Sequence, residues 1–371
     1  MNNNITPGYI TLLDILIKGS DKLDFSLDSI EAGHNGPYKD EETRARNIAH
    51  WIIIFSCIYK ETKEIKYKEF SYQAIDLLLS EQFRPMKAAF FCRKNPLKDF
   101  SNGVMGQAWI MEALIYSSKV YNDGELMKQA ISLYRMHSFD SNRSLWRVLN
   151  VEGSFGDFDQ TFNHQLWFAS IAAKLDFSIA KEQSLSFMDN VLSNVELYSD
   201  GIIYHKSSIY NFKIEKNLGF GSILDYFFNK MYSFKIKRSL YSKSVGYHSF
   251  NLVALSYLYS EFKEHAFFKS KKFEKIISVI KSEQYLKSLK KSKYSYQYNP
   301  PGIEEAIALS NIISDENYAI KALERHFSIT GISNTVNVHD YHTSLARLYE
   351  IALLDIKLTT PIKVSSEMVS K

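Results

Sequence analysis

Residues that can carry out acid–base chemistry are concentrated in one stretch of the sequence, Gly153–Phe168. Its carboxyl groups are Asp157 and Asp159. Asn163 and His164 follow a few residues later. A carboxyl group can protonate a glycosidic oxygen or activate water, whereas an imidazole can remove a proton from carbon. Asp159 could instead be an ordinary helix N-cap, and His164 a hydrogen-bonded interior histidine. The stretch is therefore a candidate for two different mechanisms.

Five more stretches have the same polar character, being rich in His, Asn, Asp, Tyr and Gly. They are Gly33–Trp51, Phe100–Trp109, Val245–Leu252, Tyr296–Ala306 and Asn337–Tyr349. Each leads into an apolar segment, so all six are called entrances here and numbered in chain order. Amides and polar aromatics at helix N-termini suit a ligand with many hydroxyls, and the unpaired N–H groups also favour an anion such as a uronate carboxylate. N-capping explains any one entrance, but six together predict a shared pocket.

The polar and aromatic side chains of the entrances are the candidate substrate-binding residues. They are His34, Asn35, Asp40, Arg46, Asn47, Asn102, Gln107, Trp167, His248, Tyr298, Glu304, His339, Asp340 and His342. His50, beside Trp51 in an apolar segment, is expected to be structural. His34, His339 and His342 could ligate a metal, but HExxH and paired His/Cys spacings are missing from the sequence, so no metal is expected. GxSxG, phosphate-loop and dinucleotide-binding patterns are also missing, and no cofactor is expected.

The segments that must position these residues are helices of two kinds. Amphipathic segments are Ile10–Lys18, Tyr67–Gln82, Glu125–Met136, Ala180–Leu197, Lys271–Leu289 and Glu316–Phe327. Segments that are apolar almost all round are Ala45–Tyr59, Val104–Lys119, Phe162–Lys174, Ser249–Tyr259, Ile303–Ile313 and Thr343–Leu354. The second kind must be buried on every side, whereas the first needs one wet face.

Strict alternation of six and six predicts an all-α (α/α)6 toroid of six helical hairpins, in which the N-terminal helix completes the last pair. An open helical-repeat array has the same local pattern, but these repeats vary in length and share no tight consensus. Asp200-Gly201, between β-prone runs, predicts a short β-hairpin insertion over 198–212. No interdomain linker is visible, so residues 1–371 are expected to form a single domain.

Bulk composition excludes several classes of protein. The net charge is only +4, and much of the basic excess lies in Lys269–Lys293, which we interpret as a solvated helix face; no nucleic-acid partner is expected. Cys57 and Cys92 are expected to be reduced core thiols. The N-terminus does not resemble a secretory signal, and the longest strongly apolar run, Ile52–Ile58, is too short to span a bilayer. We expect a cytoplasmic protein; its oligomeric state is open.

Three motifs carry a resemblance that covers nearly the whole chain: "HNGPYKDEETRARNIAHW", "NGVMGQAWIMEAL" and "DQTFNHQLWFA". They resemble a family of (α/α)6 proteins encoded in glycan-assembly clusters, including the archaeal Agl cluster. That family is distantly similar to the unsaturated glucuronyl and rhamnogalacturonyl hydrolases. The resemblance implies hydrolysis of a uronic-acid-containing oligosaccharide or polysaccharide in surface-glycan metabolism. It also implies an Asp at an inner-helix entrance, for which Asp159 is the first choice, with Asp157, Asp40 and Glu304 as other carboxyl candidates.

A second resemblance is local. "FNHQLWF" and "GYHSFNL" are similar to the Asn-His-x-x-Trp and Tyr-His segments of alginate-lyase-type toroids. It implies a lyase in which Asn163 neutralises the uronate carboxylate, His164 takes the C5 proton and Tyr247 delivers one. A uronate C5-epimerase needs similar groups, and a non-catalytic glycan-binding protein is a third hypothesis. We favour hydrolysis, because the whole-chain resemblance outweighs the local one.

Overall fold

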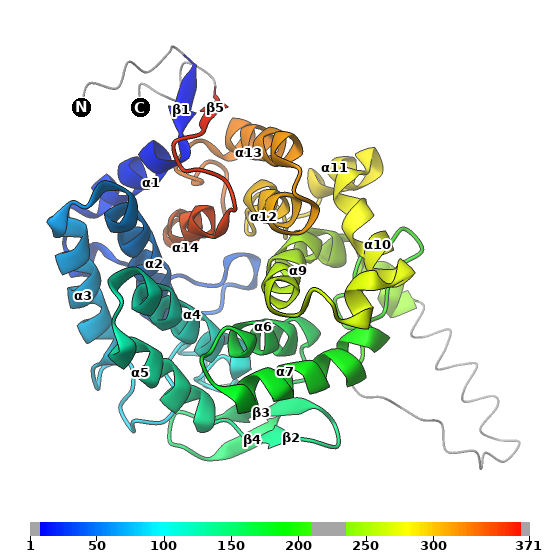
Figure 1. Ribbon diagram of the computed structural model, residues 1–371, viewed down its shortest axis with the longest axis horizontal. Coiled ribbons are helices and arrows are strands. Elements are labelled where there is room, and N and C mark those ends of the chain that lie inside the picture. Colours follow the sequence, from blue (N-terminus) through cyan, green and yellow to red (C-terminus); the bar gives the residue numbers. More distant parts are fainter. Residues whose placement is uncertain (1–7, 210–234, 365–371) are drawn as a thin grey trace, which may run out of the picture.

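The computed structural model describes residues 8–209 and 235–364 of the chain. Its helices form two concentric rings (Figure 1). The inner ring consists of α2 (Ala45–Thr62), α4 (Gly103–Tyr121), α6 (Phe162–Ala173), α9 (Tyr241–Phe262), α12 (Pro301–Ala308) and α14 (Tyr341–Ala346), which the 3-10 helix η8 (Arg347–Leu353) continues. The outer ring consists of α1 (Leu12–Ser20), α3 (Ile65–Leu79), α5 (Gly124–Arg135), α7 (Ser178–Asn190), α10 (Lys271–Ser278), α11 (Glu283–Leu289) and α13 (Glu316–Thr330).

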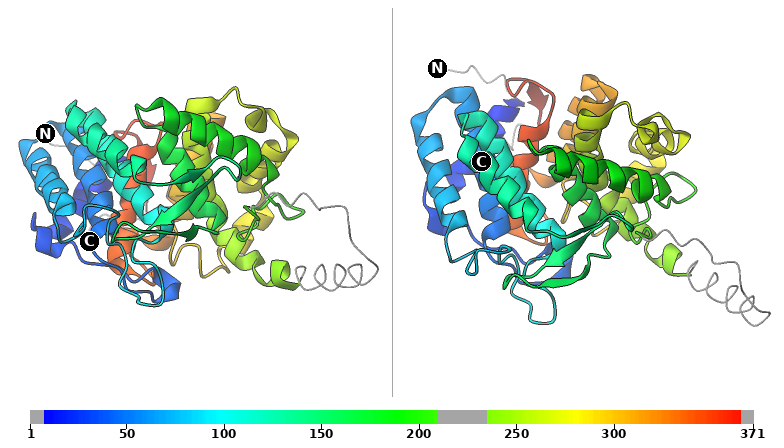
Figure 2. Two further views of the ribbon diagram at one scale, coloured as in Figure 1. Left: turned by 90° about the horizontal axis from the view of Figure 1, so that it is seen from below. Right: turned by 60° about the horizontal axis from the view of Figure 1, so that its bottom comes forward.

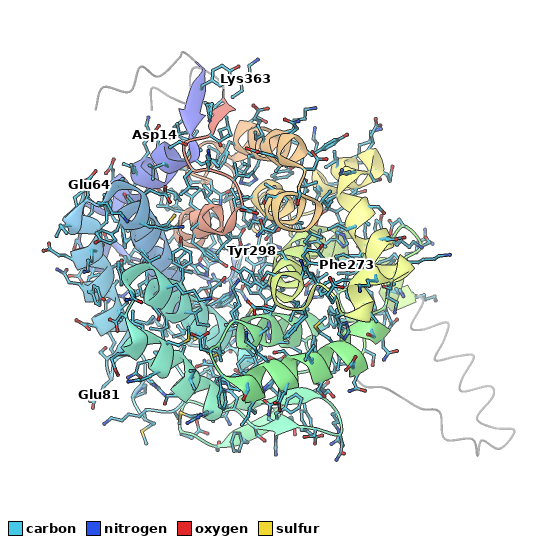
Figure 3. All side chains as sticks on the ribbon, viewed as in Figure 1. Asp14, Glu64, Glu81, Phe273, Tyr298 and Lys363 are labelled. Carbon is cyan, nitrogen blue, oxygen red and sulfur yellow. The ribbon has the colours of Figure 1, made fainter. Side chains whose placement is uncertain are left out.

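Burial explains why the two kinds of helix have different sequences. The inner helix α6 packs against α4, α7 and α9, and every residue of it except His164 is buried. The outer helix α10 buries Phe273 and Ile276 and turns its lysines to solvent, as predicted for the basic stretch. Figure 3 shows Tyr298 near the ring axis and Glu64 at the periphery. The predicted alternation of buried and amphipathic helices is confirmed.

Contacts between the first and last helices close the ring. Neighbouring inner helices touch in chain order, and η8 contacts both α12 and α2. Helix α1 lies against α2 and η8, which completes the sixth pair as predicted. Beside it, β1 (Tyr9–Thr11) pairs antiparallel with β5 (Pro361–Lys363). The fold is therefore the predicted (α/α)6 toroid and not an open array.

A three-stranded antiparallel sheet between α5 and α6 was not predicted. It consists of β2 (Phe139–Asp140), β3 (Leu145–Leu149) and β4 (Phe155–Phe158). Strands of two to five residues are too short for a clear period-two pattern. Figure 2 shows the sheet near one end of the ring, close to the loop that joins α3 to α4.

The predicted hairpin near residue 200 is a minimal one. Gly201 N–H donates to Tyr198 O at 3.0 Å, and Leu197 and Ile203 form a single antiparallel bridge. Residues 210–212 of the predicted insertion lie outside the described part of the chain.

Two predicted helices are interrupted in the structure. The segment predicted as one outer helix over 271–289 breaks at the 3-10 turn Val279–Lys281, and a π-helical turn, Leu309–Ile313, replaces the end of the predicted helix 303–313. Among the described residues, no helix is long and apolar enough to cross a membrane.

Candidate active site

All six entrances open onto one cavity of about 650 Å³ at the N-terminal ends of the inner helices. Seven of the predicted site residues line it: Asn35, Arg46, Asn102, Asn163, His164, Tyr247 and Tyr298. The rest of the wall is Tyr38, Arg93, Lys98, Met105, Trp109, Gln160, Thr161, residues 205–209, Lys243, Phe250, Asn299 and Arg347. The entrances meet there because the inner ring is closed and its six helices all begin at the same end of the ring.

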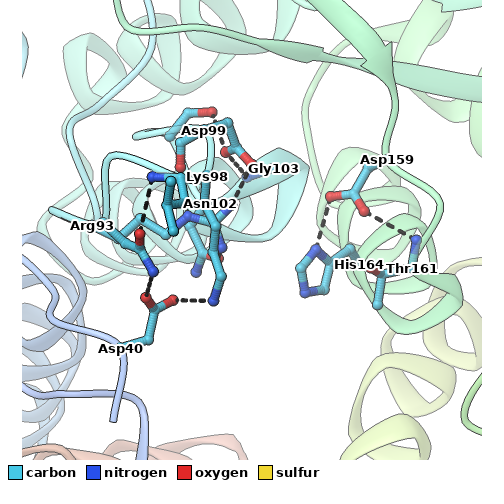
Figure 4. A network of polar contacts seen from close by, with 12 residues as sticks. Asp40, Arg93, Lys98, Asp99, Asn102, Gly103, Asp159, Thr161 and His164 are labelled. Carbon is cyan, nitrogen blue, oxygen red and sulfur yellow. Dashed lines mark hydrogen bonds and ion pairs between the residues drawn. The ribbon is translucent and has the colours of Figure 1, made fainter. Parts of the chain in front are cut away.

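His164 faces the cavity from the first turn of α6, next to Asn163. Its Nδ1 lies 2.8 Å from Asp159 Oδ2, and because an ionised carboxylate can only accept, Nδ1–H donates; in the neutral form of the ring the lone pair is then on Nε2. Figure 4 shows this pair across from the Asp40–Lys98 pair of the first entrance and the adjoining loop. An imidazole held in one tautomer by a buried carboxylate is arranged to accept a proton from a bound molecule.

Asp159 lies behind His164 and does not line the cavity. Besides His164, it accepts the backbone N–H of Val104 at 3.1 Å on Oδ2 and that of Thr161 at 3.1 Å on Oδ1. Burial alone would raise the pKa of Asp159, but the charge and hydrogen bond of His164, together with these N–H groups, hold it below its ordinary value. Asp159 is therefore an ionised, fully bonded carboxylate that ties α4 to α6.

Gly103, the first residue of α4, makes this close approach possible. Its φ is +58°, and a Cβ built there would lie 1.9 Å from Asp159 Oδ2. Asp99 Oδ1 accepts the Gly103 N–H at 2.6 Å, and Arg93 donates to Asn102 Oδ1 at 3.1 Å. The second entrance is thus built around a position that only glycine can occupy.

Several predicted binding residues instead hold the entrances together. Asp40 bonds Lys98 and Asn95, each at 2.7 Å. Asp340 caps α14 and accepts the N–H of His34 at 2.8 Å, which ties the sixth entrance to the first. In the same way, Gln107 bonds the backbone of Phe90 and Ser101, Asn47 donates to Glu31 O, and His248 bonds the backbone of Ile203 and Ile276.

The remaining predicted residues also lie away from the cavity wall. Asp157 on β4, His339 and His342 are exposed, and Trp167 is buried and stacked on Phe250 with the ring centroids 4.8 Å apart. His50 is buried and stacks on Tyr349 at 4.1 Å. Among the residues that the structure describes, no three His, Cys, Asp or Glu side chains are grouped as metal ligands.

Arg347 brings charge into the cavity from the sixth entrance. Its guanidinium bonds Glu304 at 2.6 Å and Glu350 at 2.5 Å, and both glutamates are fully buried. Burial raises the pKa of Glu304, whose other oxygen accepts from Ser249. Sequence analysis marked Glu304 and missed its partner, because the partner arginine comes from a helix 43 positions further along the chain.

A cluster of tyrosines forms another part of the wall. The hydroxyls of Tyr38 and Tyr247 are 2.9 Å apart, and Tyr298 OH donates to Asn35 Oδ1 at 2.6 Å. Burial raises the pKa of Tyr38 and Tyr247 well above the ordinary value, so both phenols stay protonated at neutral pH. They can donate a hydrogen bond or a proton to a bound sugar.

His205 and Lys243 are cavity residues that sequence reasoning missed. His205 follows the minimal hairpin, its ring lies 4.5 Å from that of Tyr247, and its buried Nδ1 has no hydrogen-bond partner in the described structure. Burial and nearby positive charge lower its pKa to about 2, so the ring is neutral. The one available signal was that this histidine lies in the predicted insertion over 198–212.

The charge of the wall has one sign. Arg46, Arg93, Lys98, Lys243 and Arg347 line the cavity with Lys206, whereas no Asp or Glu among residues 8–209 and 235–364 lines it. The carboxylates that pair with the arginines and with Lys98 lie behind the wall. A cavity of this kind favours an anionic ligand.

Comparison with known proteins gives one match by sequence and several by fold. No protein-family profile matches the sequence. Archaeal glycosylation protein Q of Haloferax volcanii is 32% identical over 362 residues, which span 93% of this chain and 98% of that one. Among solved structures, D-mannose isomerase (TM-score 0.58, 11% identity, 91% of this chain and 95% of that one) shares the fold.

Two more solved structures share it. Cellobiose 2-epimerase from Bacillus thermoamylovorans has a TM-score of 0.58 at 12% identity, over 91% of this chain and 98% of that one. A family 76 glycoside hydrolase from a bovine Bacteroides thetaiotaomicron strain has 0.55 at 10% identity, over 93% and 77%. At these identities the likeness shows the toroid alone. The level and extent of the sequence identity, by contrast, show that this chain belongs to the family of archaeal glycosylation protein Q.

Proposed function

We propose that the protein is a sugar-modifying enzyme of glycan assembly that moves a proton at C5 of a uronic acid residue, with His164 as the base. One observation carries this proposal: the acid–base group that faces the cavity is an imidazole oriented by a buried carboxylate, and the described wall offers no carboxyl group. Membership of a glycosylation family and a fold shared with an isomerase and an epimerase agree with it.

The C5 proton of a uronate is acidic because it is adjacent to the carboxylate. Removing it places a second negative charge on the sugar, which nearby donors must stabilise. Arg46, whose Nε–H has no partner in the described structure, and the side-chain NH2 group of Asn163 can donate to the substrate carboxylate, and the unpaired Oδ1 of Asn163 can accept from a sugar hydroxyl. His164 Nε2 accepts the C5 proton while Asp159 stabilises the imidazolium that forms.

Tyr247 is the proton donor in this scheme. Its phenol is protonated, lines the cavity and is hydrogen-bonded to Tyr38. Returning a proton to C5 from the opposite face gives the C5 epimer. Delivering it to a leaving oxygen at C4 instead gives an unsaturated uronate, which is the lyase outcome. We favour epimerisation, because the relative is a glycosylation protein. Inversion at C5 keeps the glycan intact during its assembly, whereas a lyase would cleave it.

Glycoside hydrolysis, favoured from the sequence alone, has less support in the cavity. Hydrolysis by the usual route needs two carboxyl groups that flank the scissile bond. Asp159 faces away from the wall with both oxygens bonded, Asp157 is exposed on β4, and Glu304 is bound to Arg347. The shared fold of the family 76 hydrolase does not supply the missing pair.

Proton exchange in heavy water tests the proposal. Glucuronate-containing oligosaccharides incubated with the full chain in D₂O should gain deuterium at C5 and the inverted configuration, both read by NMR. His164→Gln should abolish the exchange. His265→Gln is the matched control, because His265 pairs with Asp189 at 3.0 Å in the outer layer and should leave exchange unchanged. New reducing ends without deuterium, or undiminished exchange in His164→Gln, would overturn it.

A further inference from the structure

Lys243, in the first turn of α9, has an unusual place in the cavity wall. Its ammonium lies over three tyrosine rings, 4.8 Å from the centroid of Tyr38, 5.6 Å from Tyr294 and 5.8 Å from Tyr247. Cation–π contacts of this kind fix the position of a lysine without neutralising it. No carboxylate in residues 8–209 or 235–364 forms an ion pair with it.

Other lysines add charge at the same place. Lys206 lines the cavity. Lys293 lies over the ring of Tyr294, one of the three tyrosines around Lys243, at 5.3 Å from its centroid. Together with burial, Lys206 and Lys293 lower the pKa of Lys243 to about 8. Elsewhere in the wall, Lys98 and the three arginines each have a carboxylate behind them, as Lys98 has Asp40 at 2.7 Å. Lys206, Lys243 and Lys293 therefore form a cluster of positive charges, and a bound anion would reduce the repulsion between them.

We propose that Lys206 and Lys243 form a phosphate subsite of the cavity, which takes a phosphate ester carried by the sugar substrate. The inference rests on the proposed function only in placing the sugar in this cavity. Ammonium groups act as compact point charges toward phosphate, whereas planar bidentate binding of a carboxylate is the property of arginine. The hydroxyl of Tyr38 beside Lys243 supplies a neutral donor for the ester oxygens, which leaves Tyr247 for the proton transfer.

With this assignment, two sides of the cavity wall bind different parts of the substrate. The side with Asn163, Arg46 and His164 binds the reacting uronate, and the lysine side binds the group to which the sugar is attached. The phosphate can belong to a nucleotide or to a lipid carrier. Both present the same ester chemistry to the subsite, so the experiment separates them by competition.

Calorimetric titration of the full chain with a matched pair of ligands tests the subsite. Glucuronic acid 1-phosphate and methyl glucuronide differ in the phosphate. Because a hydrogen bond to a charged group contributes about 1.5–3 kcal/mol, the phosphate should increase affinity by at least about tenfold at low salt. Lys243→Met and Lys206→Met should each remove most of this gain, and Lys243→Arg should keep part of it.

Lys321→Met is the matched control, because Lys321 lies over Tyr318 at 5.4 Å on the outer helix α13. It should leave both affinities unchanged. Competition by uridine diphosphate but not by hexyl phosphate supports a nucleotide source, and the reverse supports a lipid source. Equal affinity for the two glucuronides, or a phosphate gain that survives in Lys243→Met, overturns the subsite.

The two proposals can fail separately. His164→Gln should lose proton exchange but keep the difference in affinity between glucuronic acid 1-phosphate and methyl glucuronide, because that difference depends on the lysine side of the wall. Exchange on methyl glucuronide without any phosphate gain would therefore remove the subsite and leave the proposed function standing.

Discussion

Replacing Asp159 by Asn should reduce turnover and leave the protein folded. The wild-type carboxylate accepts Nδ1–H of His164 at 2.8 Å in a site where Asp159 is only 7% exposed. A buried hydrogen bond to a charged group contributes about 1.5–3 kcal/mol, and its loss from the transition state corresponds to a decrease in kcat of about 10- to 150-fold. The amide can also donate to Nδ1, which would move the proton of His164 to the nitrogen that must act as the base. In a serine-protease triad the same change costs about 10⁴ in kcat, which sets the upper bound.

The folded state should tolerate the change. Asn keeps one oxygen for the backbone N–H of Val104 or Thr161, so the loss of stability should be about 1–3 kcal/mol. The size of this stability loss depends on pH. Because the folded pKa of Asp159 is lowered, its ionised form stabilises the protein above the unfolded pKa, and that stabilisation is lost as the pH falls through the folded pKa. The Asn variant should therefore lose less stability on acidification than the wild type.

The assay is deuterium exchange at C5 across a pH range, with urea unfolding in parallel. Asp159→Asn, His164→Gln and the double variant should be compared. If the two residues act as one unit, the double variant should be no slower than His164→Gln. Near-wild-type kcat in Asp159→Asn would refute the orienting role. Hydrolysis that is lost in Asp159→Asn but kept in His164→Gln would instead identify Asp159 as a general acid.

Three further substitutions test the framework of the site. Arg347→Met leaves two buried glutamates without their cation, so the free energy of unfolding should fall by about 3–5 kcal/mol in urea titrations. Gly103→Ala places a methyl group against Asp159 at a positive φ and should lower both the melting temperature and kcat. Burial raises the pKa of Glu112 to about 7, so the folded protein holds a proton that the unfolded chain releases, and stability should fall as pH rises from about 5 to about 7. Glu112→Gln should flatten that slope in urea midpoints measured at both ends of the range.

The sequence by itself determined the two layers of helices. Residues 162–173 contain so few polar side chains that they could only be buried on all sides, and residues 271–289 so many lysines that one face had to be wet. Six repeats of that contrast require an inner and an outer layer. The polar entrances could be located for the same reason, because hydrogen-bonding side chains stood out where apolar helices begin.

Only the tertiary structure decided which entrance residues face the cavity. Asp159 and His164 are five positions apart, yet Asp159 is enclosed by the backbone N–H groups of Val104 and Thr161, whereas His164 faces the cavity. Asp340 and Glu304 are bonded to partners from other entrances, which no local pattern reveals. His205 and Lys243 enter the wall from segments with no distinguishing motif. The direction of a side chain depends on how each helix is rotated in the closed ring, and that rotation is set by packing between helices far apart in the chain.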